Sequence, residues 1–366
     1  MTNGKTVGIA SYGAYIPRHR LSVEEPLRIW NNMFLSVLKE QLMISERAVI
    51  LPDEDTITMS AEAAKQALSR WGDHRRDFNA LYFGTCTNSY DSRPSSTLLA
   101  EALGAECWTT CCDLQFSTKS GTAALQIASA MVSSGAMGSA IAIGADVINK
   151  HVAPGTLQEY AGSAGAAAFI VSEAEQEVIA TIGPFTTYTS DLSDMFRLSG
   201  ERYIRSGGSA VQESGLGFLD HIGRAVERHL SRLSLKPKDI DYVVFQQPFA
   251  VVPIALALRL GFGMQQVTQG LVAYELGDLG SASVGVGLAN VLDSAEPGQT
   301  ILLASYGFGA GADVTLLTTT ENIRAMRRTG PSVEQQIQQK TVVDYATAMK
   351  YEHKYMKVDH ALTAWS

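Results

Sequence analysis

The chain has 366 residues, of which 46% are hydrophobic and 18% are charged, and its net charge is −8 at pH 7. The acidic balance, and the lack of a Lys/Arg cluster beside aromatic residues, exclude nucleic acid as a partner. No apolar run approaches the ~18 residues that cross a bilayer, and the first residues do not resemble a signal peptide, so we expect no membrane association and a cytoplasmic location.

Helix and strand patterns follow one another along the chain and then recur. The first copy is expected to have a helix over 59–71, a buried strand over 78–87, and a helix followed by a strand within 121–145. The second copy is expected to have the same elements over 219–233, 240–249 and 281–305. The segments that start at Gly121 and Ser281 align without gaps, which indicates an internal duplication.

The duplication predicts two halves, residues 1–175 and 176–320, whose sheets share one core because no Pro/Ser-rich linker separates them. Strands that alternate with helices predict an α/β fold with a largely parallel sheet covered on both faces. Residues 321–366 fall outside the duplication. Aromatic residues such as Tyr345 and Trp365 favour docking of this extension on its own chain or on a partner, with disorder as the alternative.

The four cysteines are expected to be free thiols, because they are too few for a disulfide framework and two of them are adjacent. They are Cys86, Cys107, Cys111 and Cys112. The spacing of Cys107 and Cys111 lacks the paired CxxC or His ligands of a zinc site, so we expect no metal.

A glycine-rich run over 305–311 follows an apolar strand, as a nucleotide-binding loop would. The residues after it, ADVTLLTTT, predict a strand, whereas a dinucleotide loop must open a helix. We therefore expect no nucleotide cofactor. Gly307, Gly309 and Gly311 allow either a tight hairpin or a wall of backbone N–H groups beside a pocket.

Six motifs resemble the archaeal and bacterial 3-hydroxy-3-methylglutaryl-CoA (HMG-CoA) synthases and, more distantly, the ketoacyl-ACP synthase III family. They are PDEDTITMSAEAA (52–64), DLQFSTKSGTAAL (113–125), AIGAD (142–146), YVVFQQP (242–248), LGDLGSAS (276–283) and SYGFGAGAD (305–313). The resemblance covers about residues 6–320 and implies a thiolase fold. Two duplicated βαβαβαββ-type halves would form a five-layered α/β/α/β/α core.

Further segments resemble a narrower family, the HMG-CoA-synthase-like subunits of the bacterial monoacetylphloroglucinol/2,4-diacetylphloroglucinol acetyltransferase complex. They are GTCTNSYDSRPSS (84–96), RYIRSG (202–207), FQQ (245–247) and the tail over 343–365. This resemblance implies acetyl transfer between acetylphloroglucinols in antibiotic biosynthesis, a branch of secondary metabolism. It also implies a homodimer that binds a thiolase-like catalytic subunit and a small OB-fold subunit. The β-prone run over 107–116 fits the strand that pairs across the two-fold axis of such dimers.

The catalytic positions of the parent family have changed in this chain. Thr118 stands in place of the nucleophilic Cys, Gln246 in place of the His, Cys86 in place of the Glu, and Asp278 in place of an Asn. A threonine hydroxyl needs a base to ionise, and a glutamine amide does not accept a proton at neutral pH. We therefore expect a degenerate pocket with no catalytic residue in this chain.

Each position also has a structural interpretation. Thr118 would cap the helix that follows it, and Gln246 would be a hydrogen-bonded group beneath the pocket. Cys86 is the best alternative nucleophile, but without a base its pKa would stay near ~8.5 or higher, and a small buried apolar role is favoured.

Three functions are therefore weighed. The main prediction is a structural, non-catalytic thiolase-fold subunit of a multi-component C-acyltransferase. The alternative is an active acyl-CoA condensing enzyme that uses Cys86 or Thr118 as an unusual nucleophile. A third possibility is a binding module that holds a small acyl or phenolic ligand for its partner.

Overall fold

The computed structural model describes residues 5–72, 78–175, 177–207, 217–326 and 329–355. A ten-stranded sheet runs in the order β12-β13-β14-β8-β1-β7-β6-β4-β5, with β9 paired to β14. Its strands are β1 (Val7–Tyr15), β4 (Ala80–Gly84), β5 (Thr110–Leu114), β6 (Ser139–Val147), β7 (Ala164–Glu173), β8 (Ala180–Ile182), β9 (Thr186–Leu192), β12 (Tyr242–Phe245), β13 (Thr300–Gly307) and β14 (Gly309–Thr319).

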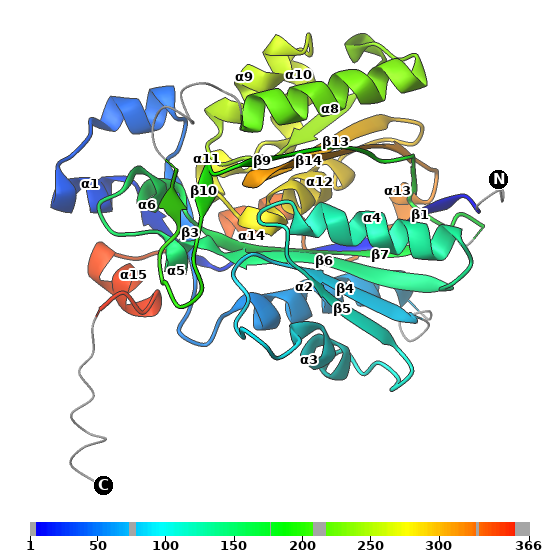
Figure 1. Cartoon of the computed structure of the whole chain (residues 1–366), viewed down its shortest axis with the longest axis horizontal. Helices are drawn as coiled ribbons and strands as arrows, with labels where there is room; N and C mark the ends of the chain where they lie inside the picture. Colours follow the sequence, from blue (N-terminus) through cyan, green and yellow to red (C-terminus); the bar gives the residue numbers. More distant parts are fainter. Residues whose placement is uncertain (1–4, 73–77, 176, 208–216, 327–328, 356–366) are drawn as a thin grey trace, which may run out of the picture.

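Helices lie outside and between the two parts of this sheet, which gives the five layers expected of the duplicated fold (Figure 1). The outer helices are α2 (Thr56–Trp71) and α3 (Ser95–Ala102) on one side and α8 (Phe218–Leu233) and α9 (Val251–Arg259) on the other. The central layer consists of α4 (Ser120–Ser133) and α12 (Ser283–Leu292). Three buried apolar clusters fill the spaces between these layers.

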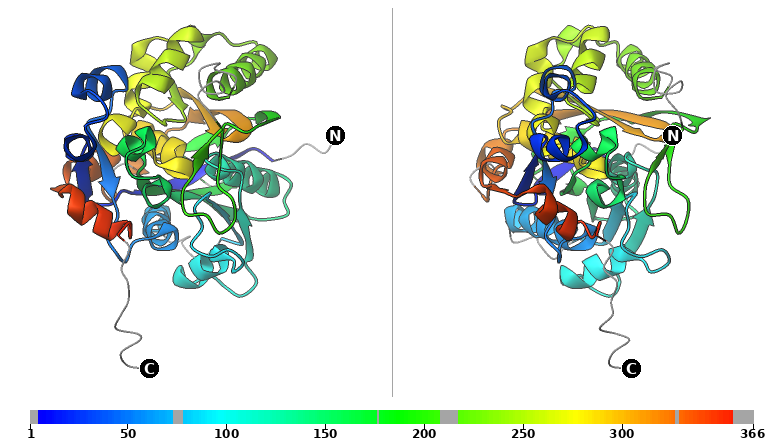
Figure 2. Two further views of the ribbon diagram at one scale, coloured as in Figure 1. Left: turned by 60° about the vertical axis from the view of Figure 1, so that its left-hand side comes forward. Right: turned by 90° about the vertical axis from the view of Figure 1, so that its left-hand side faces the viewer.

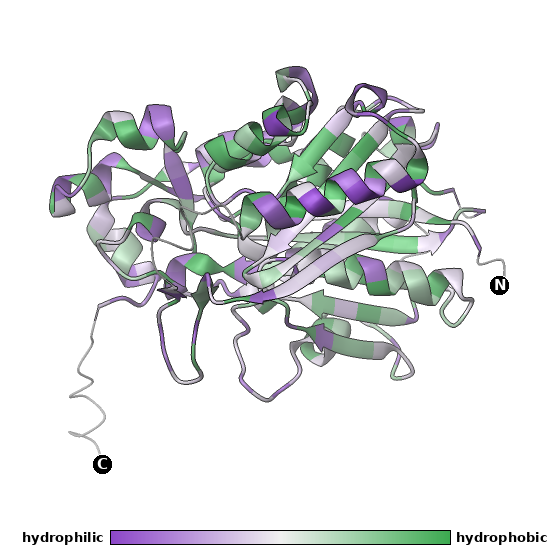
Figure 3. Ribbon diagram, turned by 45° about the horizontal axis from the view of Figure 1, so that its top comes forward, coloured by the Kyte–Doolittle hydropathy of each residue, from purple (hydrophilic) through white to green (hydrophobic). Residues whose placement is uncertain are grey.

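The outer helices form where the sequence pattern places them. In α8, Ile222, Val226 and Leu230 recur on one face and are buried against the sheet, while the opposite face is polar. The hydropathy colouring shows green strands inside and hydrophilic residues along the outer helices (Figure 3). The start of α2 is fixed by Asp55, whose carboxylate accepts hydrogen bonds from the backbone N–H groups of Ile57 and Thr58.

The prediction of a largely parallel sheet is wrong, because the sheet is mixed. Within the described part of this large sheet, the parallel pairs are β4–β5, β4–β6 and β12–β13. The pairs β6–β7, β1–β7 and β13–β14 are antiparallel. The chain turns back directly at the end of β13, so no crossover helix separates β13 from β14. The first half follows the order βαβαβαββ, whereas the second half has no strand between α9 and α12 in the described residues.

A small three-stranded sheet, ordered β15-β2-β3, lies beside the main body. It comprises β2 (His19–Ser22), β3 (Glu46–Val49) and β15 (Thr341–Val342), and α15 (Tyr345–Tyr351) packs against it. Over residues 329–355 the extension therefore lies against its own chain, and α15 lies close to the N-terminal α1 (Glu24–Trp30; Figure 2). Trp365 lies outside the described residues.

The remaining elements are short. They are η1 (Val37–Gln41), α5 (Ile148–His151), α6 (Leu157–Ala161), β10 (Met195–Phe196), β11 (Arg205–Ser206), η3 (Pro237–Asp239), α10 (Met264–Val267), η4 (Thr268–Gly270), α11 (Ala273–Leu276), η5 (Gly280–Ala282), α13 (Ile323–Met326) and α14 (Val333–Gln338). Among the described helices, none combines the length and the apolar character that crossing a membrane would require.

The two halves approach each other closely at Ser281. A Cβ atom added at Gly144 would lie 2.5 Å from the Ser281 carbonyl oxygen and 2.9 Å from the Gly121 Cα. Gly121 faces the same carbonyl oxygen. Larger side chains at these two positions would therefore force the halves apart.

Gly144→Ala is expected to lower the free energy of unfolding by about 1–3 kcal/mol, because backbone atoms must shift to admit the methyl group. Gly223→Ala is the matched control, since a Cβ there meets no atom within 4 Å. In the interior of α8 it should raise stability by about 0.5–1 kcal/mol. Urea unfolding of both variants tests this, and equal effects would contradict the close contact.

Candidate functional site

A cavity of about 330 Å³ opens between the two halves. Thr118, Gln246 and Asp278 border it, so three of the four positions that the resemblance singled out meet at one site. Its apolar wall is formed by Ile148, Val152, Leu157, Ala161, Met195, Ile204, Phe218, Leu219, Pro248, Phe249, Val252 and Phe308. Cys86 does not border the cavity.

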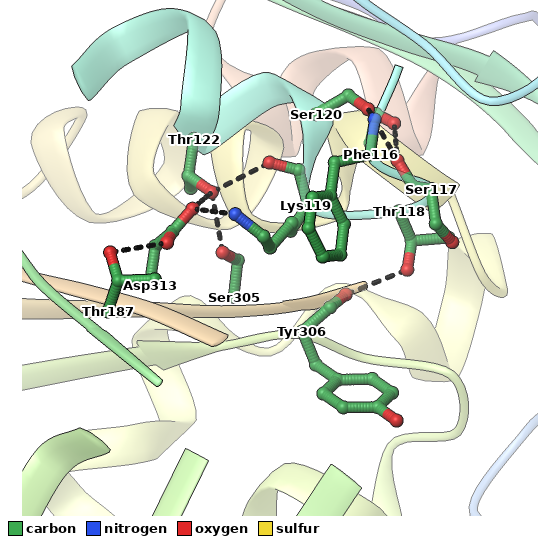
Figure 4. Close-up of polar contacts among 11 residues, drawn as sticks. Phe116, Ser117, Thr118, Lys119, Ser120, Thr122, Thr187, Ser305, Tyr306 and Asp313 are labelled. Carbon is green, nitrogen blue, oxygen red and sulfur yellow. Dashed lines mark hydrogen bonds and ion pairs between the residues drawn. The ribbon is translucent and has the colours of Figure 1, made fainter. Parts of the chain in front are cut away.

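Thr118 lies at the tight turn that leads into α4. The preceding residue, Ser117, has a left-handed backbone with φ of 50°. The Thr118 hydroxyl donates a hydrogen bond to the backbone carbonyl of Tyr306 at 2.7 Å (Figure 4). The N-cap residue of α4 is Lys119, and no side chain caps the helix. The expectation that Thr118 caps α4 is therefore wrong, because the turn points its hydroxyl across to β13.

A buried ion pair next to Thr118 joins the two halves. The Lys119 ammonium lies 2.7 Å from the Asp313 carboxylate on β14, and both side chains are almost fully buried (Figure 4). Thr187 also donates to Asp313, at 3.0 Å. The positive charge beside Thr118 is thus paired with a carboxylate and is not available to stabilise an alkoxide.

The glycine-rich run forms the hairpin between β13 and β14, and it borders the cavity through Tyr306 and Phe308. Gly307, Gly309 and Gly311 are not among the lining residues. Gly309 has a φ of 101°, which the turn requires. A Cβ at Gly311 would lie 2.7 Å from the Phe116 ring, so this glycine makes room for Phe116. Phe308 was not predicted, because nothing in its spacing distinguishes it from a solvent-exposed turn residue.

Gln246 is only partly satisfied by hydrogen bonds. Its side-chain nitrogen donates to the Gly280 carbonyl at 2.8 Å, as expected of a buried polar group. Its side-chain oxygen Oε1 is buried and has no partner among the described residues. An unpaired buried acceptor is costly, so this oxygen is suited to a ligand or water that donates a hydrogen bond.

Cys86 is held by Asp146, a fully buried carboxylate at the end of β6. The Asp146 carboxylate accepts hydrogen bonds from the Cys86 backbone N–H at 2.8 Å and from its thiol at 3.3 Å. Burial, followed by the nearby negative charge of Asp146, raises the pKa of the Cys86 thiol well above its ordinary value of 9.0. The thiol therefore stays protonated at neutral pH and is a poor nucleophile.

Asp146 was not predicted from the sequence, although it ends the motif AIGAD. The carboxylate also accepts hydrogen bonds from the Thr87 hydroxyl at 2.6 Å and from the Ser281 backbone N–H at 2.6 Å. The available signal was its position, since an acidic residue at the end of a buried apolar strand needs several donors. In the described residues, no cluster of three or more His, Cys, Asp or Glu side chains could hold a metal ion, and all four cysteines are free.

Asp278 follows the left-handed turn at Gly277 and borders the cavity. Burial raises the pKa of Asp278 from its ordinary value of 3.8 to about 7, with a smaller contribution from the Asp146 charge, although the Gly280 N–H donates to it at 2.9 Å. Asp278 thus changes protonation near neutral pH inside the cavity.

Because the folded chain raises the pKa of Asp278, its stability should fall as the pH rises from about 4 through about 7. Asp278→Asn removes this group and should flatten that part of the profile. From pH 5 to pH 8, we expect the unfolding free energy of the parent to fall by about 2 kcal/mol relative to that of the variant. This figure is reduced because solvent still reaches the Asp278 side chain. Urea unfolding at the two pH values measures this, and parallel profiles would contradict the raised pKa.

Comparison with known proteins places this site in a family. Residues 230–319 match the family model described as "3-Oxoacyl-[acyl-carrier-protein (ACP)] synthase III C terminal". The hydroxymethylglutaryl-CoA synthase of Methanosarcina barkeri is 38% identical over 349 residues, which cover 95% of this chain and 99% of the relative. The synthase of Methanocaldococcus jannaschii is 38% identical over 347 residues, with 95% and 99% coverage.

Solved structures match the fold over almost the whole chain. MvaS in complex with 3-hydroxy-3-methylglutaryl coenzyme A superposes with a TM-score of 0.83 at 21% identity, covering 96% of this chain and 92% of that chain. The 3-oxoacyl-(acyl carrier protein) synthase III of Pseudomonas aeruginosa has a TM-score of 0.78 at 20% identity, covering 86% and 98%. These matches confirm the predicted thiolase-like α/β fold. With this fold and more than one third identity along nearly its full length, the chain belongs to the hydroxymethylglutaryl-CoA synthase family.

Proposed function

We propose that this chain is a structural subunit of a multi-component C-acyltransferase that moves acetyl groups between acetylphloroglucinols. A second, thiolase-like chain would carry the catalytic cysteine and histidine, and a small OB-fold chain would complete the assembly. The observation that carries the proposal is the hydrogen bond from the Thr118 hydroxyl to the Tyr306 carbonyl, at the position where the family has its nucleophile.

The chemistry of acyl transfer supports the proposed non-catalytic role. To form an acyl-enzyme, the nucleophile adds to the acyl carbonyl, loses its proton to a base, and expels the leaving group. The Tyr306 carbonyl accepts the hydrogen bond of the Thr118 hydroxyl, but a carbonyl is too weak a base to remove its proton. The Gln246 amide is also too weak a base. The Cys86 thiol has a raised pKa and lies outside the cavity. Thr118 therefore has no base among its hydrogen-bond partners in this site.

The alternative is an active acyl-CoA condensing enzyme, and the full-length relatives named hydroxymethylglutaryl-CoA synthases support it more directly than they support a partner role. In that case Asp278 is the best candidate for a base. Its pKa of about 7 matches the requirement for a general base at neutral pH, and it borders the same cavity as Thr118. This alternative predicts a covalent acyl group on Thr118 or Cys86.

Intact-mass spectrometry after incubation of the purified chain with acetyl-CoA separates the two functions. The partner role predicts no acetyl adduct on the parent chain. A stoichiometric adduct on Thr118 or Cys86, lost in Asp278→Asn, would establish the condensing enzyme instead.

A matched variant shows that the assay can detect an adduct at this site. Thr118→Cys combined with Gln246→His restores the family's nucleophile and base types, and we expect it to gain an acetyl group at position 118. Thr118→Ala combined with Gln246→His is the control and should gain none. A second control, Cys86→Ala, assigns any adduct found on the parent chain.

The cavity also fits a small ligand. Among the described residues, no Lys, Arg or His lines it, and its polar lining includes the unpaired Gln246 oxygen and the Asp278 carboxyl group. These groups favour a neutral acyl or phenolic molecule that donates a hydrogen bond over an anion. Such a ligand would be bound here for the partner chain and not acylated.

We further propose that the chain forms a homodimer through β5, which ends the strand order of the large sheet. An uncovered edge strand presents unpaired backbone groups to a second strand. Near it, Trp108 is 91% exposed, and Cys112 on β5 is also exposed.

Cys112→Lys should convert the dimer to a monomer, because equal charges would meet across the two-fold axis. Glu101→Lys, on the exposed surface of α3, changes charge without touching the edge strand and should remain dimeric. Light scattering coupled to size-exclusion chromatography measures both masses. A dimeric Cys112→Lys variant, or a monomeric parent chain, would contradict the β5 interface.

A further inference from the structure

The hairpin of β10 and β11 forms one side of the cavity. Met195 and Ile204, one from each arm, are among the lining residues. At its base, Asp194 accepts hydrogen bonds from the Tyr306 hydroxyl and from the Gly309 backbone N–H at 2.8 Å. The Gly207 N–H closes the base by donating to the Asp194 carbonyl at 2.7 Å. The base of the hairpin is therefore anchored to the β13–β14 turn.

Farther from that base, the hairpin is hydrogen-bonded to α5. The Ile204 backbone N–H donates to the His151 carbonyl at 2.7 Å, and the His151 ring nitrogen Nδ1 lies 2.8 Å from the Arg202 carbonyl. Burial lowers the pKa of His151 to about 4, so its ring is neutral at neutral pH. Since a carbonyl oxygen can only accept, Nδ1 carries the hydrogen of this bond.

The side chain of Arg202 reaches in the other direction, to the C-terminal extension. Its Nη2 donates to the backbone carbonyl of Glu352 at 3.0 Å and also to that of His353. Both carbonyls directly follow α15, where a helix leaves carbonyl groups without intrahelical partners. The hairpin and α15 lie at the same end of the molecule (Figure 1).

The segment that Arg202 binds, Glu352 and His353, is itself held in place by ion pairs. The Glu352 carboxylate pairs with Arg47 on β3 and, at 3.0 Å, with Lys354, and all three side chains are buried. A carboxylate held between two buried cations gives this end of the extension one defined position. Arg202, by contrast, is exposed, so replacing it does not remove a charged group from the protein interior.

We propose that Arg202 is a positioning residue for the cavity. By bonding the Glu352 and His353 carbonyls, it holds the β10–β11 hairpin, and with it the Ile204 side of the cavity wall, against the C-terminal extension. The extension then supports the hairpin that lines the cavity, and displacing the extension makes this hairpin more mobile. Because such coupling is reciprocal, loosening the hairpin also frees the extension. The proposal holds whether the cavity binds a ligand or carries out catalysis.

Hydrogen exchange of the full chain tests the coupling. Arg202→Ala should raise exchange about tenfold or more both in peptides spanning 195–206 and in peptides spanning 345–354, while α2 and α4 keep the parent rate. Arg202→Lys, which can still donate to a carbonyl, should restore part of the protection. Arg205→Ala is the matched control, since its side chain pairs with Glu201 of the same hairpin, and it should leave the extension unchanged.

A second readout reports access to the cavity itself. In a Thr118→Cys, Cys86→Ala background, N-ethylmaleimide should label position 118 about tenfold faster when Arg202 is also replaced by Ala. Unchanged exchange in both segments would overturn the proposal. A rise in one segment without the other, or equal labelling rates with and without Arg202, would also overturn it.

Discussion

The backbone of Ser281 is the point on which the two halves of the molecule depend. Its carbonyl faces Gly121 and Gly144 of the first half, where no side chain could be accommodated. Its N–H group donates to the buried Asp146 carboxylate at 2.6 Å. Asp146 also binds the turn after β4 through Cys86 and Thr87, so one carboxylate joins the ends of two central strands to the second half. The cavity forms beside this junction.

Contacts at and beside this junction also determine which side chains of the site could react. A buried carboxylate that accepts from the Cys86 thiol keeps that thiol protonated. On the other side, Lys119 is neutralised by Asp313, and the Thr118 hydroxyl is used in a bond to a carbonyl. What remains in the cavity is an unpaired acceptor on Gln246 and a carboxyl group on Asp278 that titrates near neutrality. Under the proposed partner role, these groups would hold a neutral ligand and would not form an acyl-enzyme.

Sequence patterns predicted the duplication and the outer helices, because apolar periodicity and a repeated order of elements are recorded in local sequence. The pocket that joins positions 118, 246 and 278 was predicted from the family resemblance, not from periodicity. The mixed sheet and the role of Phe308 depend on how the β13–β14 hairpin folds back, and glycine spacing left two conformations open. Asp146 and Arg202 act through partners more than fifty residues away in the chain, and no local pattern identifies such contacts.

The proposed partner role requires that this chain does not take an acetyl group from a thioester by itself. Chromatographic measurement of free CoA released from acetyl-CoA tests it most directly, with the purified chain at a concentration comparable to that of the substrate. We expect release no faster than hydrolysis in buffer, without an initial burst. A burst of CoA equal to the concentration of chains would contradict it.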